Sequence, residues 1–130
     1  MSLVNAINEL VVSSVTDSIK FYEDNFGFAL DFTDGDPIIW AQVKKDNIRL
    51  MFQDYNDAKN NINNFPVKVN NSNLIMFEYS NANEVKSLYE KLKSNNVEFF
   101  EDYTETDYGK VELGIYDIDR NMILVSALME

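Results

Sequence analysis

The side chains best placed for chemistry in this chain are three glutamates on expected strands. Glu9, Glu78 and Glu112 each lie in a segment where alternation directs them to the face that holds no helix. An ionised carboxylate only accepts hydrogen bonds, so such a group recognises a donor-rich cation. The alternative is that they lie at a partly exposed strand edge or pair with Arg49. A general-base role for one of them stays open, because a carboxylate with a raised pKa can take a proton without metal or histidine.

Aromatic side chains form the second group of candidates. Trp40 lies between Ile39 and Ala41 in an expected strand, where it either packs in the core or stacks on a ligand. Tyr108 precedes Gly109 in an expected loop, which favours stacking at the mouth of a cleft. The candidate ligand-binding residues are Trp40, Tyr108, Glu9, Glu78, Glu112, Arg49, Met51 and Tyr116.

Two residue types are absent, and each absence excludes a class of chemistry. Without cysteine the chain has no disulfide, zinc-thiolate site, iron–sulfur cluster or thiol nucleophile. Without histidine it lacks the commonest general base and transition-metal ligand. The acidic segment 31–36 lacks the spacing and the final glutamate of a calcium loop, so it is interpreted as a hairpin turn.

The charge balance is strongly acidic. The 130 residues include 11 basic and 22 acidic side chains, for a net charge of −11. This charge repels phosphate backbones and anionic lipid, so neither nucleic acid nor membrane is an expected partner, whereas a small cationic or aromatic molecule is. No apolar run approaches the roughly 18 residues of a membrane span, and the expected location is the cytoplasm.

The chain reads as one α+β domain, residues 1–130, built from two copies of a β-α-β-β-β module. Module 1 covers about residues 1–53, residues 54–72 form a linker loop with room for one helical turn around 58–62, and module 2 covers about 73–130. Expected helices begin at Ser14 and Asn81, and the first ends at Gly27. The expected strands are 4–12, 28–33, 38–43, 47–53, 73–79, 97–103, 110–116 and 122–128.

Several runs resemble the vicinal oxygen chelate superfamily of glyoxalases, bleomycin resistance proteins and dioxygenases. The opening runs 7–12, 17–22 and 26–28 are similar to its strand, its S-I-x-F-Y helix start and its L-G-F turn. Residues 107–109 and 115–121 resemble its final hairpin, with Ile118 and Arg120 at the positions of the family's Pro and Gly. The resemblance implies two βαβββ modules forming a curved mixed sheet cup.

Enzymes of this superfamily hold a divalent metal with one His, Gln or Glu from each of four strands. Carried over position by position, these ligand positions fall on Ile7, Met51, Leu74 and Leu124. All four are apolar, so no metal and no cofactor is expected. Either these side chains simply fill the core, or they also provide an apolar floor for a flat ligand.

This pattern is most similar to the metal-free bleomycin resistance branch, which sequesters a cationic drug as a homodimer. We therefore expect a binding protein that sequesters a cationic aromatic antibiotic of the bleomycin type, and binding rather than catalysis. The alternatives are a metal-independent lyase or isomerase on the same scaffold and an interaction module without a small ligand.

Overall fold

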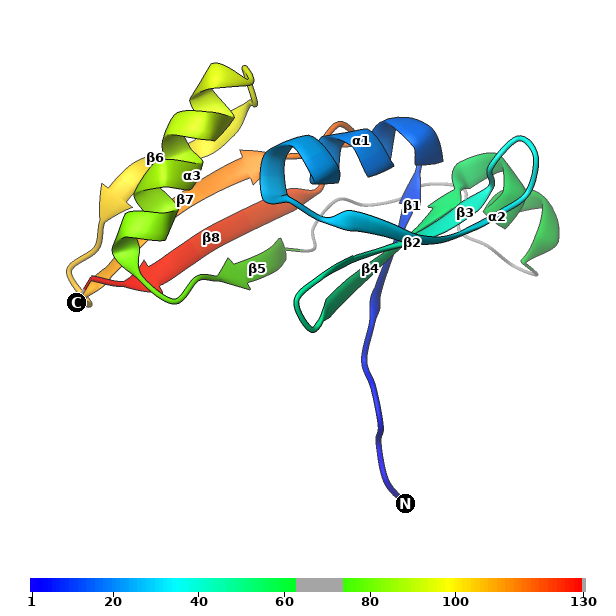
Figure 1. Ribbon diagram of the computed structural model, residues 1–130, viewed down its shortest axis with the longest axis horizontal. Helices are drawn as coiled ribbons and strands as arrows, with labels where there is room; N and C mark the ends of the chain where they lie inside the picture. The colour runs from blue at the N-terminus through cyan, green and yellow to red at the C-terminus, as the bar shows by residue number, and fades with distance from the viewer. Residues whose placement is uncertain (63–73, 130) are drawn as a thin grey trace. The chain divides into compact units, whose positions relative to one another are not determined.

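The computed structural model describes residues 1–62 and 74–129. The chain divides into two compact units, Met1–Val69 and Asn70–Glu130. Each unit contains one four-stranded mixed sheet with a long helix packed on one of its faces (Figure 1). The fold is therefore α+β with a repeated βαβββ module, as the sequence predicts. None of the described helices has the length and apolar character needed to cross a membrane.

The first unit places its strands in the order β1-β4-β3-β2. Strand β1 runs parallel to β4, and the other neighbours are antiparallel. The elements are β1 (Asn8–Val12), α1 (Val15–Phe26), β2 (Ala29–Asp34), β3 (Trp40–Lys45), β4 (Ile48–Asp54) and α2 (Tyr55–Asn61).

Helix α1 begins and ends where local chemistry predicts. The Ser14 hydroxyl accepts a hydrogen bond from the Asp17 backbone N–H at 3.1 Å, which satisfies one of the free donors of the first turn. Gly27 ends the helix with φ of 76°, a left-handed conformation that glycine adopts at little cost. The buried face of α1 includes Ile19 and Tyr22, and the Tyr22 ring lies 5.2 Å from that of Phe52 on β4. This contact joins the helix to its sheet.

The second unit repeats the arrangement with the order β5-β8-β7-β6. Asn81 caps its long helix by accepting from the Glu84 backbone N–H at 2.9 Å, and Val85, Leu88 and Leu92 form the buried face. Strand β5 runs parallel to β8, and the remaining pairs are antiparallel. The elements are β5 (Leu74–Glu78), α3 (Ala82–Ser94), β6 (Phe99–Glu105), β7 (Lys110–Tyr116) and β8 (Met122–Leu128).

Helix α2 corrects the expected loop at the start of the linker. The Asp54 carboxylate accepts from the Asp57 backbone N–H at 3.0 Å, and the Asn61 side chain donates to Asp57 Oδ1 at 2.8 Å. Ala58 is its one fully buried residue, and the Gln53 side chain on β4 donates to Asp57 Oδ2 at 3.1 Å. A helix with polar caps and a single buried alanine has no apolar periodicity, so the hydrophobic pattern of the sequence does not predict it. The remainder of the expected linker, 63–72, lies outside the described residues.

Strand β1 is shorter than expected, which changes the position of Ile7. The ladder between β1 and β4 runs only from Asn8 opposite Leu50 to Val12 opposite Asp54. The strand therefore begins at Asn8 rather than at residue 4, and Ile7 lies immediately before it. The first of the four family ligand positions is thus outside the sheet.

Each sheet has two chemically different faces. The face toward the long helix is apolar and buried, and includes Phe52 in the first unit and Leu113 in the second. The opposite face, called the distal face below, carries the polar and mixed positions. Cross-strand pairing decides which residues share a face, because directly opposite side chains point the same way. The candidate residues all belong to the distal faces, apart from Ile7, which precedes β1, and Tyr108, which precedes β7.

Candidate functional site

Four polar residues form one row across the distal face of the second sheet. Glu78 on β5 lies opposite Ser126 on β8, Ser126 lies opposite Glu112 on β7, and Glu112 lies opposite Thr104 on β6. We call these four residues the polar row. Both central members are buried, with Glu112 8% and Ser126 1% exposed. A buried carboxylate costs free energy unless hydrogen bonds or a cation compensate it.

Tyr108 supplies one such hydrogen bond. Its hydroxyl donates to Glu112 Oε2 at 2.6 Å, a short distance typical of a hydroxyl on a carboxylate. The bond stabilises the protonated phenol and raises the pKa of Tyr108, and burial and the acidic neighbours add to the effect. Tyr108 itself is 63% exposed, so its ring covers the carboxylate while remaining open to contact.

Two further charged residues accompany the polar row. Glu101 lies opposite Gly114, one row away from Glu112, and its pKa is raised first by burial and then by the charge of Glu112. Lys110 Nζ lies 3.7 Å from Glu78 Oε2, a loose ion pair at the other end of the row. With all groups ionised, the row and its neighbours carry three carboxylates and one ammonium group, and the ammonium group is paired only with Glu78 among the described contacts. This excess of negative charge favours an additional cation.

A pocket of about 300 Å³ opens at the Glu78 end of the polar row. Both members of the loose ion pair line it, which places a carboxylate and an ammonium at one small opening. The lining residues are Glu78, Tyr79, Ser80, Lys110, Ala127 and Leu128.

The positions next to the polar row are apolar. Met76 lies opposite Leu124, and Leu74 lies opposite Met122, all on the distal face. Leu74 and Met76 are about half exposed, so this surface can contact an apolar group. The family's metal ligands would lie on this face at Leu74 and Leu124, and neither side chain has a donor atom for a metal. The residues at these positions do not fit the family's metal.

The described residues also contain no group of three or more Asp, Glu, His or Cys side chains arranged to hold a metal ion. In the first sheet, the family ligand position on β4 is Met51, which lies on the distal face opposite Glu9. A thioether there offers only a weak, soft donor.

Tyr116 is held by the protein's own side chains. The Phe100 ring lies 5.4 Å from the Tyr116 ring and covers Gly114, where any Cβ would collide with it. The Arg120 guanidinium lies 4.0 Å from the Tyr116 ring centroid, within cation–π range. Tyr116 therefore packs against side chains of β6 and of its own hairpin, which weakens its candidacy as a ligand contact.

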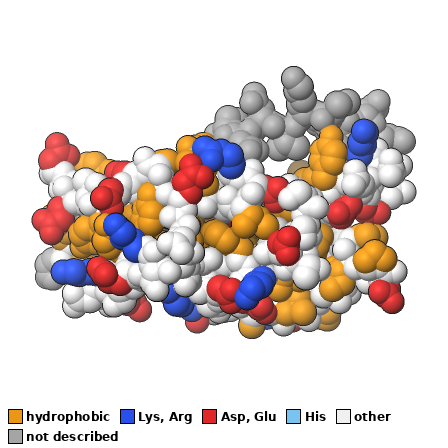
Figure 2. Space-filling view, turned by 90° about the horizontal axis from the view of Figure 1, so that it is seen from above, with side chains coloured by type: hydrophobic (Ala, Val, Ile, Leu, Met, Phe, Trp, Pro, Cys, Tyr) orange, Lys and Arg blue, Asp and Glu red, His pale blue; other side chains and the backbone are white. Residues whose placement is uncertain are grey.

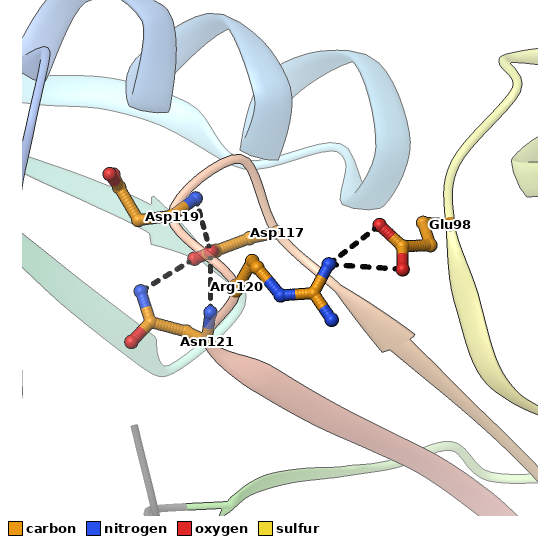
Figure 3. Close-up of polar contacts among 5 residues, drawn as sticks. All are labelled: Glu98, Asp117, Asp119, Arg120 and Asn121. Atoms are coloured by element: carbon orange, nitrogen blue, oxygen red, sulfur yellow. Dashed lines mark hydrogen bonds and ion pairs between the residues drawn. The ribbon is translucent and has the colours of Figure 1, made fainter. Parts of the chain in front are cut away.

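The hairpin between β7 and β8 forms although it lacks the family's Pro and Gly (Figure 3). The Asp117 carboxylate accepts from the backbone N–H groups of Asp119 and Asn121, both at 2.9 Å. Arg120 takes the left-handed conformation at φ of 64° in place of glycine. Its guanidinium donates to both carboxylate oxygens of Glu98 at 2.9 and 3.0 Å.

The distal face of the first sheet holds the other candidates. Trp40 is half-buried, and its indole N–H donates to Glu9 Oε1 at 3.2 Å across the intervening strand. The buried Gln42 donates to Asp31 Oδ2 at 2.7 Å. Arg49 lies on the same face, and within the described part of this unit it forms no ion pair with Glu9. The alternative that Glu9 forms an internal ion pair with Arg49 is not observed there, and Glu9 is exposed on its strand.

The structure thus joins two pairs of the expected site residues, Tyr108 with Glu112 and Trp40 with Glu9. Sequence reasoning missed Ser126 and Glu101. A single serine in the apolar run of β8 does not by itself indicate a binding residue. Alternation along the strand nevertheless places it on the same distal face as Leu124, two residues before it. Glu101 lies beyond a shift in the β6 register, which alternation alone does not reveal.

On the face drawn in Figure 2, Asp and Glu side chains of the described residues are scattered among exposed hydrophobic side chains rather than gathered in one patch. The net charge of −11 therefore produces a general attraction for cations. Selectivity has to come from local geometry.

The comparisons with known proteins agree on family and fold. Residues 4–125 match the Glyoxalase/Bleomycin resistance protein/Dioxygenase superfamily. A search of curated proteins finds no match. A glyoxalase/bleomycin resistance protein/dioxygenase from Nocardioides superimposes with a TM-score of 0.79 at 16% identity, covering 100% of this chain and 86% of that one.

Two other solved structures, which are named differently from each other, share the fold. TioX from Micromonospora sp. ML1 gives a TM-score of 0.74 at 11% identity, covering 97% and 99% of the two chains. Lactoylglutathione lyase from Agrobacterium tumefaciens gives 0.77 at 16% identity, covering 95% and 92%. At these identities the likeness establishes the fold alone. With the sequence match over nearly its whole length, the chain belongs to the Glyoxalase/Bleomycin resistance protein/Dioxygenase superfamily.

Proposed function

We propose that this protein binds and sequesters a small cationic, partly aromatic molecule without a metal, in the manner of a bleomycin-type antibiotic-binding protein. The observation that carries the proposal is the buried Glu112 carboxylate, held by Tyr108 on a distal face with exposed apolar neighbours. A carboxylate in such a place provides direction, and the apolar side chains provide contact area.

The charge of the cluster supports a cationic ligand. Among the described residues Lys110 pairs with Glu78 alone, while the charge of Glu112 raises the pKa of Glu101, so a cation near Glu112 would relieve repulsion between these two carboxylates. An anionic ligand would meet the same three charges and the acidic surface. The apolar replacement of the family's metal ligands is consistent with binding rather than metal-dependent chemistry.

A homodimer is part of the same proposal. Strand β2 lies at the edge of its sheet with all six residues exposed, including Leu30 and Phe32. An exposed edge strand with apolar side chains is a surface that a second copy can cover. Sedimentation equilibrium at micromolar concentration should give about twice 15.1 kDa. A monomer under these conditions would contradict this part of the proposal.

A thermal-shift screen against cationic antibiotics, matched neutral compounds and matched anionic compounds tests the binding function. A ligand that binds only the native state raises the melting temperature by mass action, so cationic aromatic compounds should give the largest shifts. Isothermal titration calorimetry on the best compound should show a one-to-one complex per chain. Added salt should mainly slow its association, because long-range attraction is screened. A best ligand that is neutral or anionic would overturn the proposal.

A further inference from the structure

The hydroxyl of Ser126 is buried without a hydrogen-bond partner among the described residues. Its side chain is 1% exposed, and no donor or acceptor lies in hydrogen-bonding geometry with Oγ. Leaving a buried hydroxyl unpaired usually costs about 1–3 kcal/mol, which alanine at the same place would avoid. An uncompensated polar group in the middle of a sheet therefore calls for an explanation.

The neighbours of Ser126 share one property, which is that they accept hydrogen bonds. Glu78 and Glu112 lie directly opposite it on the two adjacent strands, so all three side chains point to the distal face. In the antiparallel pair of Ser126 and Glu112 the Cβ atoms are about 4.5–5.5 Å apart, and the parallel strand that carries Glu78 lies about 4.8 Å from that of Ser126. The row thus holds two carboxylates and a hydroxyl oxygen side by side on one face of the sheet.

We infer that the polar row binds the primary or secondary ammonium group of the ligand, with Ser126 Oγ as one of its acceptors. The inference rests on the proposed function and specifies its chemistry. An ammonium group is compact and carries two or three diverging N–H donors, which can reach the two carboxylates and the hydroxyl together. A quaternary ammonium has no N–H donor and leaves Ser126 unpaired. Lys110, 3.7 Å from Glu78, shows that an ammonium group reaches this carboxylate.

Two matched probes test the inference. Phenethylamine and its N,N,N-trimethylammonium analogue carry the same ring and charge and differ in their N–H donors. In an NMR titration of the labelled protein, phenethylamine should shift the amide signals of Glu78, Glu112 and Ser126. The trimethyl analogue should bind at least about tenfold more weakly, because it forms no charged hydrogen bond.

The variant Ser126→Ala isolates the hydroxyl. It should weaken phenethylamine binding by about two- to tenfold, the loss expected for one neutral hydrogen bond, and leave the trimethyl analogue unaffected. Ser18→Ala is the matched control, because Ser18 is equally buried and its Oγ also lacks a partner among the described residues, but it lies on α1. Both alanine variants should fold, since each removes an unpaired hydroxyl.

The outcomes separate this inference from the proposed function. Equal affinity for the two probes, or native-like phenethylamine binding by Ser126→Ala, would overturn the ammonium inference. If Glu112→Gln still weakens both cations in that case, the proposed function stands. Failure of the native protein to bind any cation, in the titration and in the antibiotic screen, would remove both.

Discussion

The two modules share a topology but treat buried polar groups on their distal faces differently. In the first, Gln42 is buried and its side-chain amide is bonded to Asp31 at 2.7 Å. In the second, Ser126 is buried with no partner among the described residues, and Glu112 is buried with a single tyrosine donor. On its distal face the first module bonds its buried amide internally. The second retains acceptors that a ligand can use.

The two distal faces also differ in their charged side chains. On the first distal face Glu9 is exposed and paired with the Trp40 indole, while Lys44 and Arg49 add positive charge. On the second, burial raises the pKa of Glu101, and the nearby charge of Glu112 raises it further. A duplicated fold can thus keep one copy as a self-contained sheet and use the other for recognition. The predictions below test this division.

Removing core side chains should have the largest effect and should not distinguish the modules. Leu50→Ala in the first and Leu113→Ala in the second each empty a fully buried site on the helix side. Each should lower the free energy of unfolding by about 2–5 kcal/mol, measured by urea denaturation. A cost well below this range for Leu113 alone would mean that the second module lacks a comparable core.

Most of this fold could be predicted from local sequence signals. Ser14, Gly27 and Asn81 lie where capping rules place them, and β7 and β8 have the bounds that alternation predicts. Helix α2 lies where the sequence predicted a linker loop with room for one helical turn around 58–62, because its stability comes from the Asp54 cap and not from an apolar stripe. A capping residue can therefore indicate a short helix even where the following residues show no apolar periodicity.

The candidate site was less predictable, because its contacts join residues on different strands, and the pairing register of those strands decides which residues lie side by side. Alternation places Glu78 and Glu112 on the correct face, but only the ladder places Ser126 between them. The bond from Tyr108 to Glu112 spans the start of β7, and that from Trp40 to Glu9 crosses a whole strand. Neither pair has a sequence spacing that predicts contact.

Neutralising one glutamate in each module should have the next largest effect, this time on binding. Glu112→Gln should weaken a cationic ligand by about 1–3 kcal/mol, the range for a charged hydrogen bond, while glutamine still accepts from Tyr108 and keeps the melting temperature nearly unchanged. Glu9→Gln is the matched change in the first module and should weaken binding less, because Glu9 is exposed and bonded to Trp40. Calorimetry on both variants measures this difference. Equal losses would contradict the division between the modules.

A smaller effect should appear in the pH dependence of stability. The pKa of Glu101 is raised in the folded protein, so the native state binds its proton more tightly than the unfolded chain does. The stability contributed by this group is therefore full below the ordinary glutamate pKa and is lost as pH rises through the raised value. Glu101→Gln should match the native protein at low pH and melt at a higher temperature near neutrality.

Melting temperatures of the native protein and Glu101→Gln between pH 3.5 and 7.5 measure where the two proteins begin to differ. Since the charge of Glu112 contributes to the shift, Glu112→Gln should bring the Glu101 pKa back toward its ordinary value in an NMR titration. Glu9→Gln serves again as control and should not change the Glu101 titration. A Glu101→Gln variant that is less stable than the native protein near neutral pH would refute the assigned cause.

The smallest effect should come from the corresponding hairpin turns, β3–β4 in the first module and β7–β8 in the second. Each holds a non-glycine residue in the left-handed region, Asp46 at φ of 53° and Arg120 at φ of 64°. Aspartate tolerates this conformation better than arginine, so glycine should relieve more backbone strain at Arg120. The same substitution, however, removes the contacts of Arg120 with Glu98 and Tyr116.

Comparing glycine with alanine at Arg120 separates these contributions. Alanine loses the side-chain contacts and keeps the unfavourable φ, so Arg120→Ala should melt below both the native protein and Arg120→Gly. Arg120→Gly should melt close to the native protein, because relief of strain offsets a surface ion pair that is worth little. If the glycine and alanine variants melt at the same temperature, the positive φ costs nothing. The hairpin would then depend on Asp117, whose carboxylate accepts from the backbone of Asp119 and Asn121 in either variant.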